Sequence, residues 1–527
     1  MKGSSFQGAF LFVNHDANNL DARPNRQNVF THVQSRYRKW NRKERTKALL
    51  ASAKVPLGNL KQAQPANKAR DLAKSDKGKQ LDSPLDDEPD NIPERNPVLR
   101  TSAPVMLKGG SDPFDTHAVA VTPEVNELIT FFRDMVIPNI YHTGPQGWKT
   151  SKTANSHWQS AVQGLGDEGG ALGFLARYAH VAAITNKDKR MTTRAFRYTS
   201  QSTGVLRERL NDSTALAQKA SPLSQKVYWQ INMLWGTEIL SRNFGAAIIH
   251  GRMLRTLLEK QATHKQLDTT FLRYVLYNDS HLIASYMVRS VFDYDQWIPE
   301  QYKAMEGMAA AEMPNFDDIH AEEIDPSVES DFLHQVFITR REHVEVWKQR
   351  TTAAGISPLM YAWLATVNSI HQGQLIKHAL DAMDMAERVS AGSAGRLWAE
   401  VYLSLAGLYW IRSIGGSMII CGVDIYDSQR PILEKLRMAL TNAKESQTKA
   451  HAAKYENARL WALFIGAQAE QGWKRPGWFC DNLFLHGKQM GLDTWASVQE
   501  VLKRFLYTDM LPPHGSSWYK TIGGQIR

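Results

Sequence analysis

The densest set of side chains able to do chemistry is cationic and lies near the N-terminus. Lysine and arginine crowd the segment 25–50. Such charge can contact a nucleic-acid phosphate backbone, or can be read by a nuclear import receptor. A solvated helix or a disordered arm would carry the same residues, so both interpretations stay open. The candidate contact residues are Arg36, Arg38, Lys39, Arg42, Lys43, Arg45 and Lys47.

One helix is expected to present these charges. Val29, Val33, Tyr37 and Trp40 recur at helical spacing and predict a thin apolar stripe within 25–50. Nothing in this pattern specifies a base sequence, so any DNA contact is expected to be non-specific, with dissociation constants of roughly 10⁻⁴–10⁻⁶ M.

The charge of the chain is concentrated in this N-terminal arm. The whole chain carries a formal charge of +10, and residues 1–80 hold 17 lysines and arginines against 5 acidic residues. Residues 51–108 lack periodicity and large apolar side chains, so they predict a disordered linker. The sequence therefore divides into an arm, 1–108, and a nearly neutral body, 109–527.

Two further segments are similar to known ligand-binding motifs, but their composition argues against such a site. Residues 86–90, Asp-Asp-Glu-Pro-Asp, match the spacing of a magnesium site for diphosphates, but Pro89 and the surrounding composition exclude the stable helix that such a site needs. The glycine-rich segment 164–173 follows no strand, and Asp167 and Glu168 would repel a phosphate. It predicts the loop that begins a helix.

The remaining reactive residue types show no catalytic spacing. Cys421 and Cys480 fit no metal site and no disulfide framework, which favours a reducing compartment. His180, His250 and His281 fall on predicted helices and are expected to be hydrogen-bonded residues rather than metal ligands. The chain also lacks the serine-hydrolase, zinc-protease and nucleotide-loop signatures. We therefore predict no catalytic residue, no metal, no cofactor and no enzymatic activity.

Helices are expected to build the whole body. Thr122 and Pro123 predict the start of the first one, and Pro138 is expected to end it. Apolar residues then recur at helical spacing, and no segment alternates at period two, so the fold class is all-α. Segments 142–158 and 293–330 are predicted to be connections, the latter with at most short helices. The predicted helices span 171–184, 190–210, 227–240, 244–258, 271–287, 331–350, 358–389, 396–411, 430–440, 450–470, 478–490 and 493–505, the last capped by Asp493.

No segment predicts a membrane span or a signal peptide. Residues 10–13 are too short for a signal sequence. The most apolar stretch, 397–423, is interrupted by Glu400, Arg412 and a Gly-Gly pair, so it predicts a buried helix.

Several segments of the body resemble one known family. The first is the lead-in and first helix, 109–141, GGSDPFDTHAVAVTPEVNELITFFRDMVIPNIY. Others are RAFRYTSQSTGVLRERLND at 194–212, LWGTEILSRNFGAAIIHGRMLRTLLEK at 234–260 and RYVLYNDSHLIASYMVRSVFDYDQW at 273–297. The closing segments are NARLWALFIGAQAEQGWKRPGWFCDNL and TWASVQEVLKRFLY. Together they resemble the C-terminal regulatory region of fungal-specific transcription-factor domain proteins.

This resemblance implies an all-α regulatory domain, nuclear localisation and control of transcription. Many relatives also carry a zinc cluster built by six cysteines, which this chain cannot form with two. We therefore expect a transcriptional regulator or regulatory scaffold without zinc-cluster DNA binding, its arm contacting an import receptor and DNA. The alternative is a small-molecule-binding or enzymatic helical domain with an internal cavity, lined in part by tryptophan and methionine.

Overall fold

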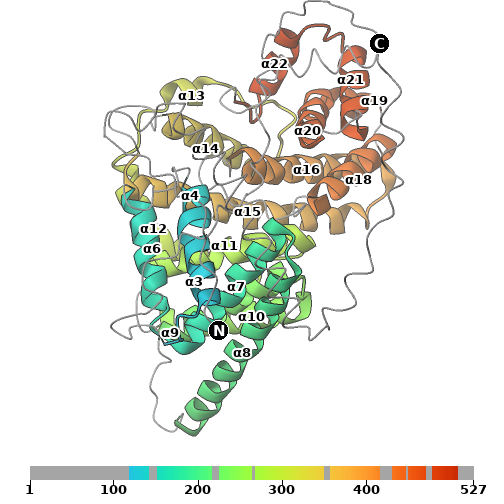
Figure 1. The fold of residues 1–527 in the computed structure, drawn as a ribbon. Helices are drawn as coiled ribbons and strands as arrows, with labels where there is room; N and C mark the ends of the chain where they lie inside the picture. Colours follow the sequence, from blue (N-terminus) through green and yellow to red (C-terminus); the bar gives the residue numbers. More distant parts are fainter. Residues whose placement is uncertain are drawn as a thin grey trace, which may run out of the picture. The chain divides into compact units, whose positions relative to one another are not determined.

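The computed structural model describes one all-helical body (Figure 1). The described residues are 118–141, 151–216, 225–263, 267–348, 356–415, 430–446, 449–470 and 477–508, all in the unit Glu94–Arg527. Within these ranges every regular element is a helix, which confirms the all-α prediction. The predicted basic helix, 25–50, and the linker, 51–108, lie outside the described residues.

The first helix begins as predicted but does not end where predicted. The Thr122 side chain accepts a hydrogen bond from the Val125 N–H at 3.3 Å, and Pro123 occupies the first turn. Pro138, expected to end the helix, lies inside a continuing helical path. A π-helical turn precedes it, and its wider hydrogen bonds accommodate a proline that lacks an N–H. The elements are α3 (Pro123–Phe131), η3 (Phe132–Val136) and α4 (Ile137–Ile140).

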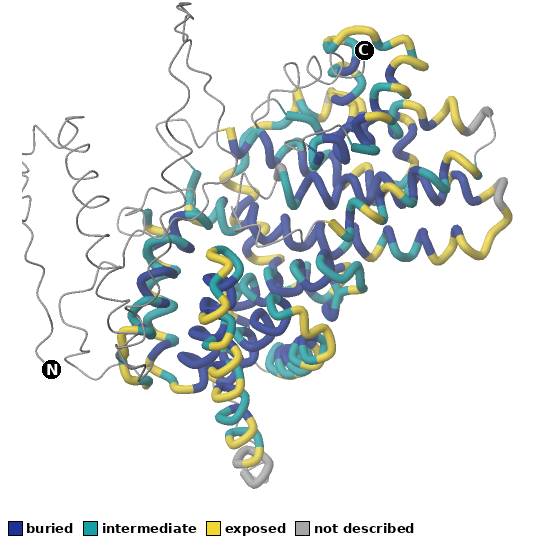
Figure 2. The backbone as a smooth tube through the Cα atoms, turned by 45° about the vertical axis from the view of Figure 1, so that its right-hand side comes forward, coloured by how far each residue is buried: buried dark blue, intermediate teal, exposed yellow. Residues whose placement is uncertain are grey.

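Two separate hydrophobic cores form the interior of the body. The first core takes its buried residues from the chain between Val125 and Tyr198. Besides the elements above, its helices are α6 (Lys152–Gly164), α7 (Glu168–Asn186) and the first half of α8 (Lys189–Leu216). Residues 207–211 of α8 are half-buried or exposed, and this end of the helix extends away from the core (Figure 2).

The second core contains the remaining buried residues, from Leu206 to Leu506. Fully buried aromatic residues such as Trp461, Phe337 and Phe505 pack ring against ring at its C-terminal end. Its helices are α9 (Gln225–Leu240), α10 (Phe244–Ala262), α11 (Thr269–Tyr286), α12 (Trp297–Ala310), α13 (Asp317–Ala321), α14 (Asp331–Lys348), α15 (Pro358–Ala386), α16 (Ala391–Trp410), η5 (Ile411–Gly415), α18 (Arg430–Ser446), α19 (Lys449–Lys454), α20 (Glu456–Ala469), α21 (Trp478–Gln489) and α22 (Trp495–Lys503).

Two expected connections contain helices instead. Helix α6 begins inside the predicted connection 142–158, where the Ser151 side chain accepts from the Ala154 N–H. The connection 293–330 contains α12, because Ile298, Tyr302, Met305 and Ala309 form a buried helical stripe among its acidic residues.

The predicted cap of the last helix is shifted by one residue. Thr494, not Asp493, caps α22, and its hydroxyl accepts from the Ser497 N–H. A threonine one residue later satisfies the same free N–H groups at the helix start.

Candidate functional site

The sequence-predicted contact residues do not enter the site described below. All seven basic residues, Arg36 to Lys47, lie outside the described residues, as do Cys421 and the acidic motif 86–90. The structure therefore neither brings the basic residues together nor separates them.

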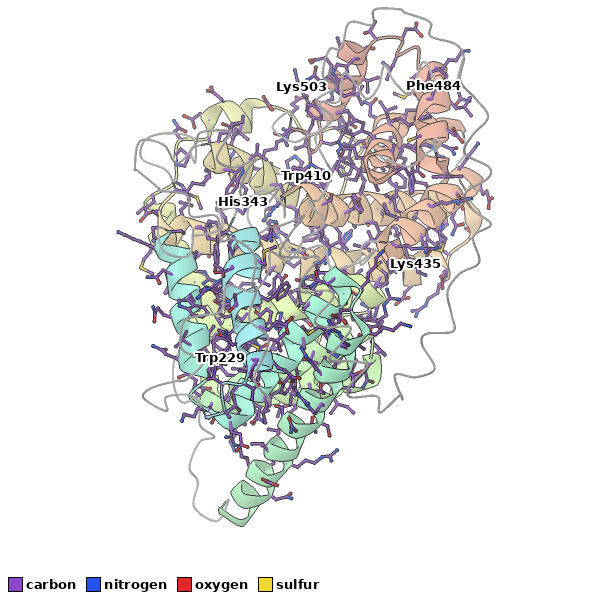
Figure 3. All side chains as sticks on the ribbon, viewed as in Figure 1. Trp229, His343, Trp410, Lys435, Phe484 and Lys503 are labelled. Atoms are coloured by element: carbon purple, nitrogen blue, oxygen red, sulfur yellow. The ribbon has the colours of Figure 1, made fainter. Side chains whose placement is uncertain are left out.

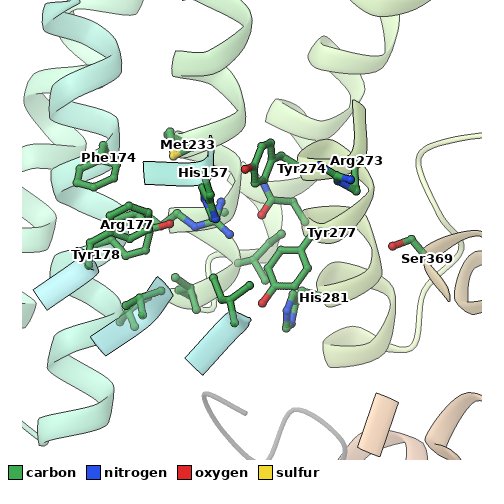
Figure 4. A pocket seen from close by; sticks show the side chains of 18 of the residues that line it. His157, Phe174, Arg177, Tyr178, Met233, Arg273, Tyr274, Tyr277, His281 and Ser369 are labelled. Carbon is green, nitrogen blue, oxygen red and sulfur yellow. The ribbon is translucent and has the colours of Figure 1, made fainter. Parts of the chain in front are cut away.

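A cavity of about 390 Å³ lies where the two hydrophobic cores meet. Its wall combines elements of both cores: η3, α4, α6 and α7 from the first, and α9, α11, α15 and α18 from the second. Each core buries its own apolar residues, and the space left between them is lined by larger polar and aromatic side chains. Figure 4 shows part of this lining: His157, Phe174, Arg177, Tyr178, Met233, Arg273, Tyr274, Tyr277, His281 and Ser369.

Helix α7 is held close to α9 by the glycine-rich start of its sequence. Asp167 caps α7 by accepting from the Gly170 N–H at 2.9 Å, and Arg209 of α8 pairs with its carboxylate. A Cβ at Gly173 would lie 3.0 Å from the Cβ of Met233, so glycine permits the close approach of the two helices. The sequence predicts that segment 164–173 is the loop that begins a helix; in the structure only residues 165–167 lie between helices, and Glu168 begins α7, three residues before the predicted start at 171.

This packing places Arg177 of α7 against α9. A Cβ at Gly236 would lie 2.5 Å from Nη1 of Arg177, so the missing side chain makes room for the guanidinium. In Figure 4 Arg177 extends from its helix into the cavity, beside His157.

A buried amide pair fixes α11 against α9. Nδ2 of Asn278 donates to the main-chain oxygen and to Oδ1 of Asn232, at 2.9 and 2.8 Å. Because buried polar groups must be paired, this contact favours one alignment of the two helices. Within that alignment Arg273, Tyr274 and Tyr277 line the cavity from the α11 side.

Aromatic rings form one section of the wall contributed by the first core. The Phe132 ring lies 5.0 Å from that of Phe174 and 4.5 Å from that of Tyr178, centre to centre. Such ring packing resists collapse of the wall and presents flat apolar faces. The Trp229 ring of α9 lies 5.3 Å from that of Tyr274, centre to centre, and also lines the cavity.

His157 of α6 and two tyrosines form a neutral polar cluster in the wall. The Tyr141 hydroxyl lies 3.1 Å from Nδ1 of His157, and the Tyr274 ring centre is 5.0 Å from that of His157. Burial, then Arg273 and Arg177, lower the pKa of His157 to about 3. Burial raises the pKa of Tyr141 to about 12 and that of Tyr274 well above its usual value. These groups are therefore uncharged at neutral pH.

His281 of α11 is held in a different way. Its Nδ1 lies 3.3 Å from Nη2 of Arg412, whose Nη1 donates to Gln372. Burial, then Arg412 and Arg177, lower the pKa of His281 well below its usual value. His281 is thus a neutral, hydrogen-bonded residue, as the sequence predicted, but one that also lines the cavity.

The charges around the cavity are unbalanced. Glu434 is the only carboxylate among the described lining residues, and it pairs with Arg430 at 2.9 Å. Within the described part of the chain, neither Arg177 nor Arg273 has a hydrogen bond or an ion pair. Two guanidinium groups therefore face the cavity without a counter-charge from the described residues.

A second buried basic cluster lies between α14 and α15, away from Trp229 in Figure 3. Arg340, 1% exposed, donates to Nδ1 of His371 at 3.0 Å and to Oδ1 of Asn368 at 3.1 Å. Burial lowers the pKa of Arg340 to about 9. Among the described residues, its Nη2 and both ring nitrogens of His343 lack hydrogen-bond partners.

The described ranges contain no cluster of metal ligands and no membrane-spanning helix. No group of three or more His, Cys, Asp or Glu side chains there is placed to hold a metal ion. No helix in those ranges is long and apolar enough to cross a bilayer.

Sequence reasoning missed Arg177 and Arg273 as site residues. Each is the lone charge in an otherwise uncharged helical run, Arg177 in ALGFLARYAHVAAI and Arg273 in FLRYVLYN. A single cation in a helix buried nearly all round is costly unless it faces a cavity or an ion partner. That mismatch is the sequence signal that could have identified both residues.

Comparisons with known proteins identify no relative. No protein-family model, no curated protein and no solved structure matches the chain. The resemblance to fungal transcription-factor domains therefore stays a prediction, and the assignment of function rests on the cavity.

Proposed function

We propose that the helical body is an effector-binding domain that holds one small organic molecule in the cavity between its two cores. The observation that carries this proposal is the cavity itself. Its volume of about 390 Å³ falls in the range of ligand pockets, and its walls combine apolar rings with a few polar groups. A body packed solid would have removed this interpretation.

The state of the polar groups favours binding over a reaction. A general base must be free to take a proton from a reacting group. His157 is hydrogen-bonded to Tyr141, and His281 to Arg412. The tyrosine hydroxyls stay protonated at neutral pH and serve as hydrogen-bond donors to a ligand.

Effector binding also suits the role implied by the family resemblance. A regulator of transcription needs a domain that changes state when a small molecule binds, and the cavity joins two cores whose packing a ligand would bridge. Nuclear localisation and DNA contact through the arm remain predictions. Deleting residues 36–47 should release a tagged protein into the cytoplasm, and an unchanged nuclear signal would remove the arm from this account.

The cavity itself can be tested with a neutral fluorescent probe, N-phenyl-1-naphthylamine. We expect one binding site on the full chain and a loss of at least about tenfold in affinity for Ala161→Trp, which places an indole in the cavity wall. Ala310→Trp is the matched control, because Ala310 is exposed on α12. The proposal fails if the probe does not bind, or if it binds all three proteins equally.

A further inference from the structure

The two arginines that face the cavity have no counter-charge within the described protein. Arg177 comes from α7 of the first core and Arg273 from α11 of the second. The charges of Arg177 and Arg273 each lower the pKa of His157, so both guanidinium groups lie near that ring. A buried or half-buried cation without an acidic partner carries a desolvation cost that an anionic ligand would relieve.

The neighbouring groups offer no alternative partner for this charge. His157 and His281 are neutral, and the phenols of Tyr141, Tyr178 and Tyr274 remain protonated because burial raises their pKa. Each protonated phenol has one O–H group that can be donated to an acceptor oxygen of an anionic ligand.

The other two lining arginines differ from this pair. Arg430 is paired with Glu434, and both side chains are about two-thirds exposed to solvent. Arg242 also interacts with other groups of the protein. The unbalanced positive charge of the described wall is therefore concentrated at Arg177 and Arg273.

Flat apolar surfaces complete the wall. Phe132, Phe174 and Tyr178 form a contiguous ring cluster, and Trp229 with Tyr274 forms another. Stacked and edge-on contacts between rings favour an aromatic ligand over a purely polar one. A free inorganic anion would leave these surfaces in contact with water.

We infer that the ligand is a small organic anion with an aromatic body, whose acidic group binds at Arg177 and Arg273. This inference rests on the proposed effector-binding function and specifies the ligand class for the same cavity. Arginine is suited to the task because its planar fork matches the oxygen pairs of carboxylate, sulfonate and phosphate groups.

A pair of probes that share one ring system separates this inference from the proposed function. 8-Anilinonaphthalene-1-sulfonate adds one anionic group to N-phenyl-1-naphthylamine. We expect the sulfonate to bind the full chain about 10- to 100-fold more tightly than the neutral amine, as a charged hydrogen bond would give. Both probes should bind one site, and each should displace the other in a fluorescence titration.

Substitution of the arginines should remove the preference but keep the neutral probe bound. In Arg177→Met and Arg273→Met the affinity for the sulfonate should fall toward that for the amine, while Arg177→Lys should retain part of the preference. Arg207→Met makes the same change in net charge on an exposed face of α8 and should change neither affinity. Circular dichroism establishes that each variant is folded.

Each outcome decides one of the two proposals. If the amine binds one site but the sulfonate gains nothing, or if the arginine variants keep the preference, the inference about an anion is wrong and effector binding stands. If neither probe binds a single site, both are wrong. The expected pattern, in which only the two cavity arginines control the sulfonate affinity, supports both.

Discussion

Acidification should destabilise the helical body, because histidines are buried in it as neutral rings, three of them outside the cavity. His180, His343 and His371 are 4%, 5% and 9% exposed. Burial lowers the pKa of His180 to about 4. Burial, with Arg340 nearby, lowers the pKa values of His343 and His371 well below their usual value. In the unfolded chain the pKa values of all three histidines are about 6.5.

The direction and size of the effect follow from these values. Below the unfolded pKa the unfolded chain binds protons that the folded chain does not, so stability falls as the pH falls. Lowering the pH from 7.5 to 5.5 should lower the free energy of unfolding by about 1.4 kcal/mol for each histidine, or by about 4 kcal/mol for the three.

Protonation of Asp279 affects stability in the opposite direction to protonation of the histidines. Asp279 is fully buried, and burial raises its pKa to about 6. The folded chain therefore binds a proton at Asp279 as the pH falls. This raises the free energy of unfolding by about 0.8 kcal/mol at pH 5.5. For these four groups together the expected net loss is about 3 kcal/mol, a large part of a typical unfolding free energy of about 5–15 kcal/mol.

Urea unfolding followed by circular dichroism at pH 7.5, 6.5 and 5.5 measures this loss. His343→Leu removes one buried titrating ring and should reduce the loss of stability between pH 7.5 and 5.5 by about 1.4 kcal/mol. His334→Leu, on the exposed side of the same helix, is the control and should reproduce the wild-type dependence. Equal stability of the wild-type protein at pH 7.5 and 5.5 would refute the assignment of these histidines as buried neutral groups.

Two further predictions concern packing and thiol reactivity. Gly373→Ala should lower the free energy of unfolding by about 1–3 kcal/mol, because the new Cβ would lie 2.4 Å from the Tyr294 ring. Gly204→Ala, with open space around its Cβ, should instead raise the free energy of unfolding by up to about 1 kcal/mol. Urea unfolding measures both variants, and equal effects would contradict the packing around Gly373. Cys480 should resist thiol reagents at pH 8 in a Cys421→Ser protein, since burial and Glu470 raise its pKa to about 12. Labelling as fast in the folded as in the denatured protein would show that this thiol is accessible.

Local signals in the sequence were sufficient for most helices. Thr122 and Pro123 specify a helix start from local sequence alone. The buried residues of α22, Val498 and Leu502, are spaced as on one face of a helix. The errors arose where local and tertiary signals conflict. A proline such as Pro138 normally ends a helix, but here a π turn precedes it and the chain continues as α4, with Pro138 in its first turn. Acidic residues concealed the four-residue stripe of α12.

The cavity could not be predicted in the same way, because it depends on contacts between distant segments. Phe132, Arg177, Arg273 and Ser369 meet only after both cores have formed. Their spacing in the sequence carries no motif, unlike a metal or phosphate site. The alternative of an internal cavity lined by aromatic residues was accessible from composition, but the identity of its cations required the packing of α7 and α11 against α9.

A crystal structure of the full chain with 8-anilinonaphthalene-1-sulfonate tests the central claim most directly. The account predicts the ring system between the two cores, near Phe174 and Tyr178, and a sulfonate oxygen within hydrogen-bond distance of Arg177 or Arg273. A probe bound only on the outer surface, with the space between the cores closed by side chains, would contradict it.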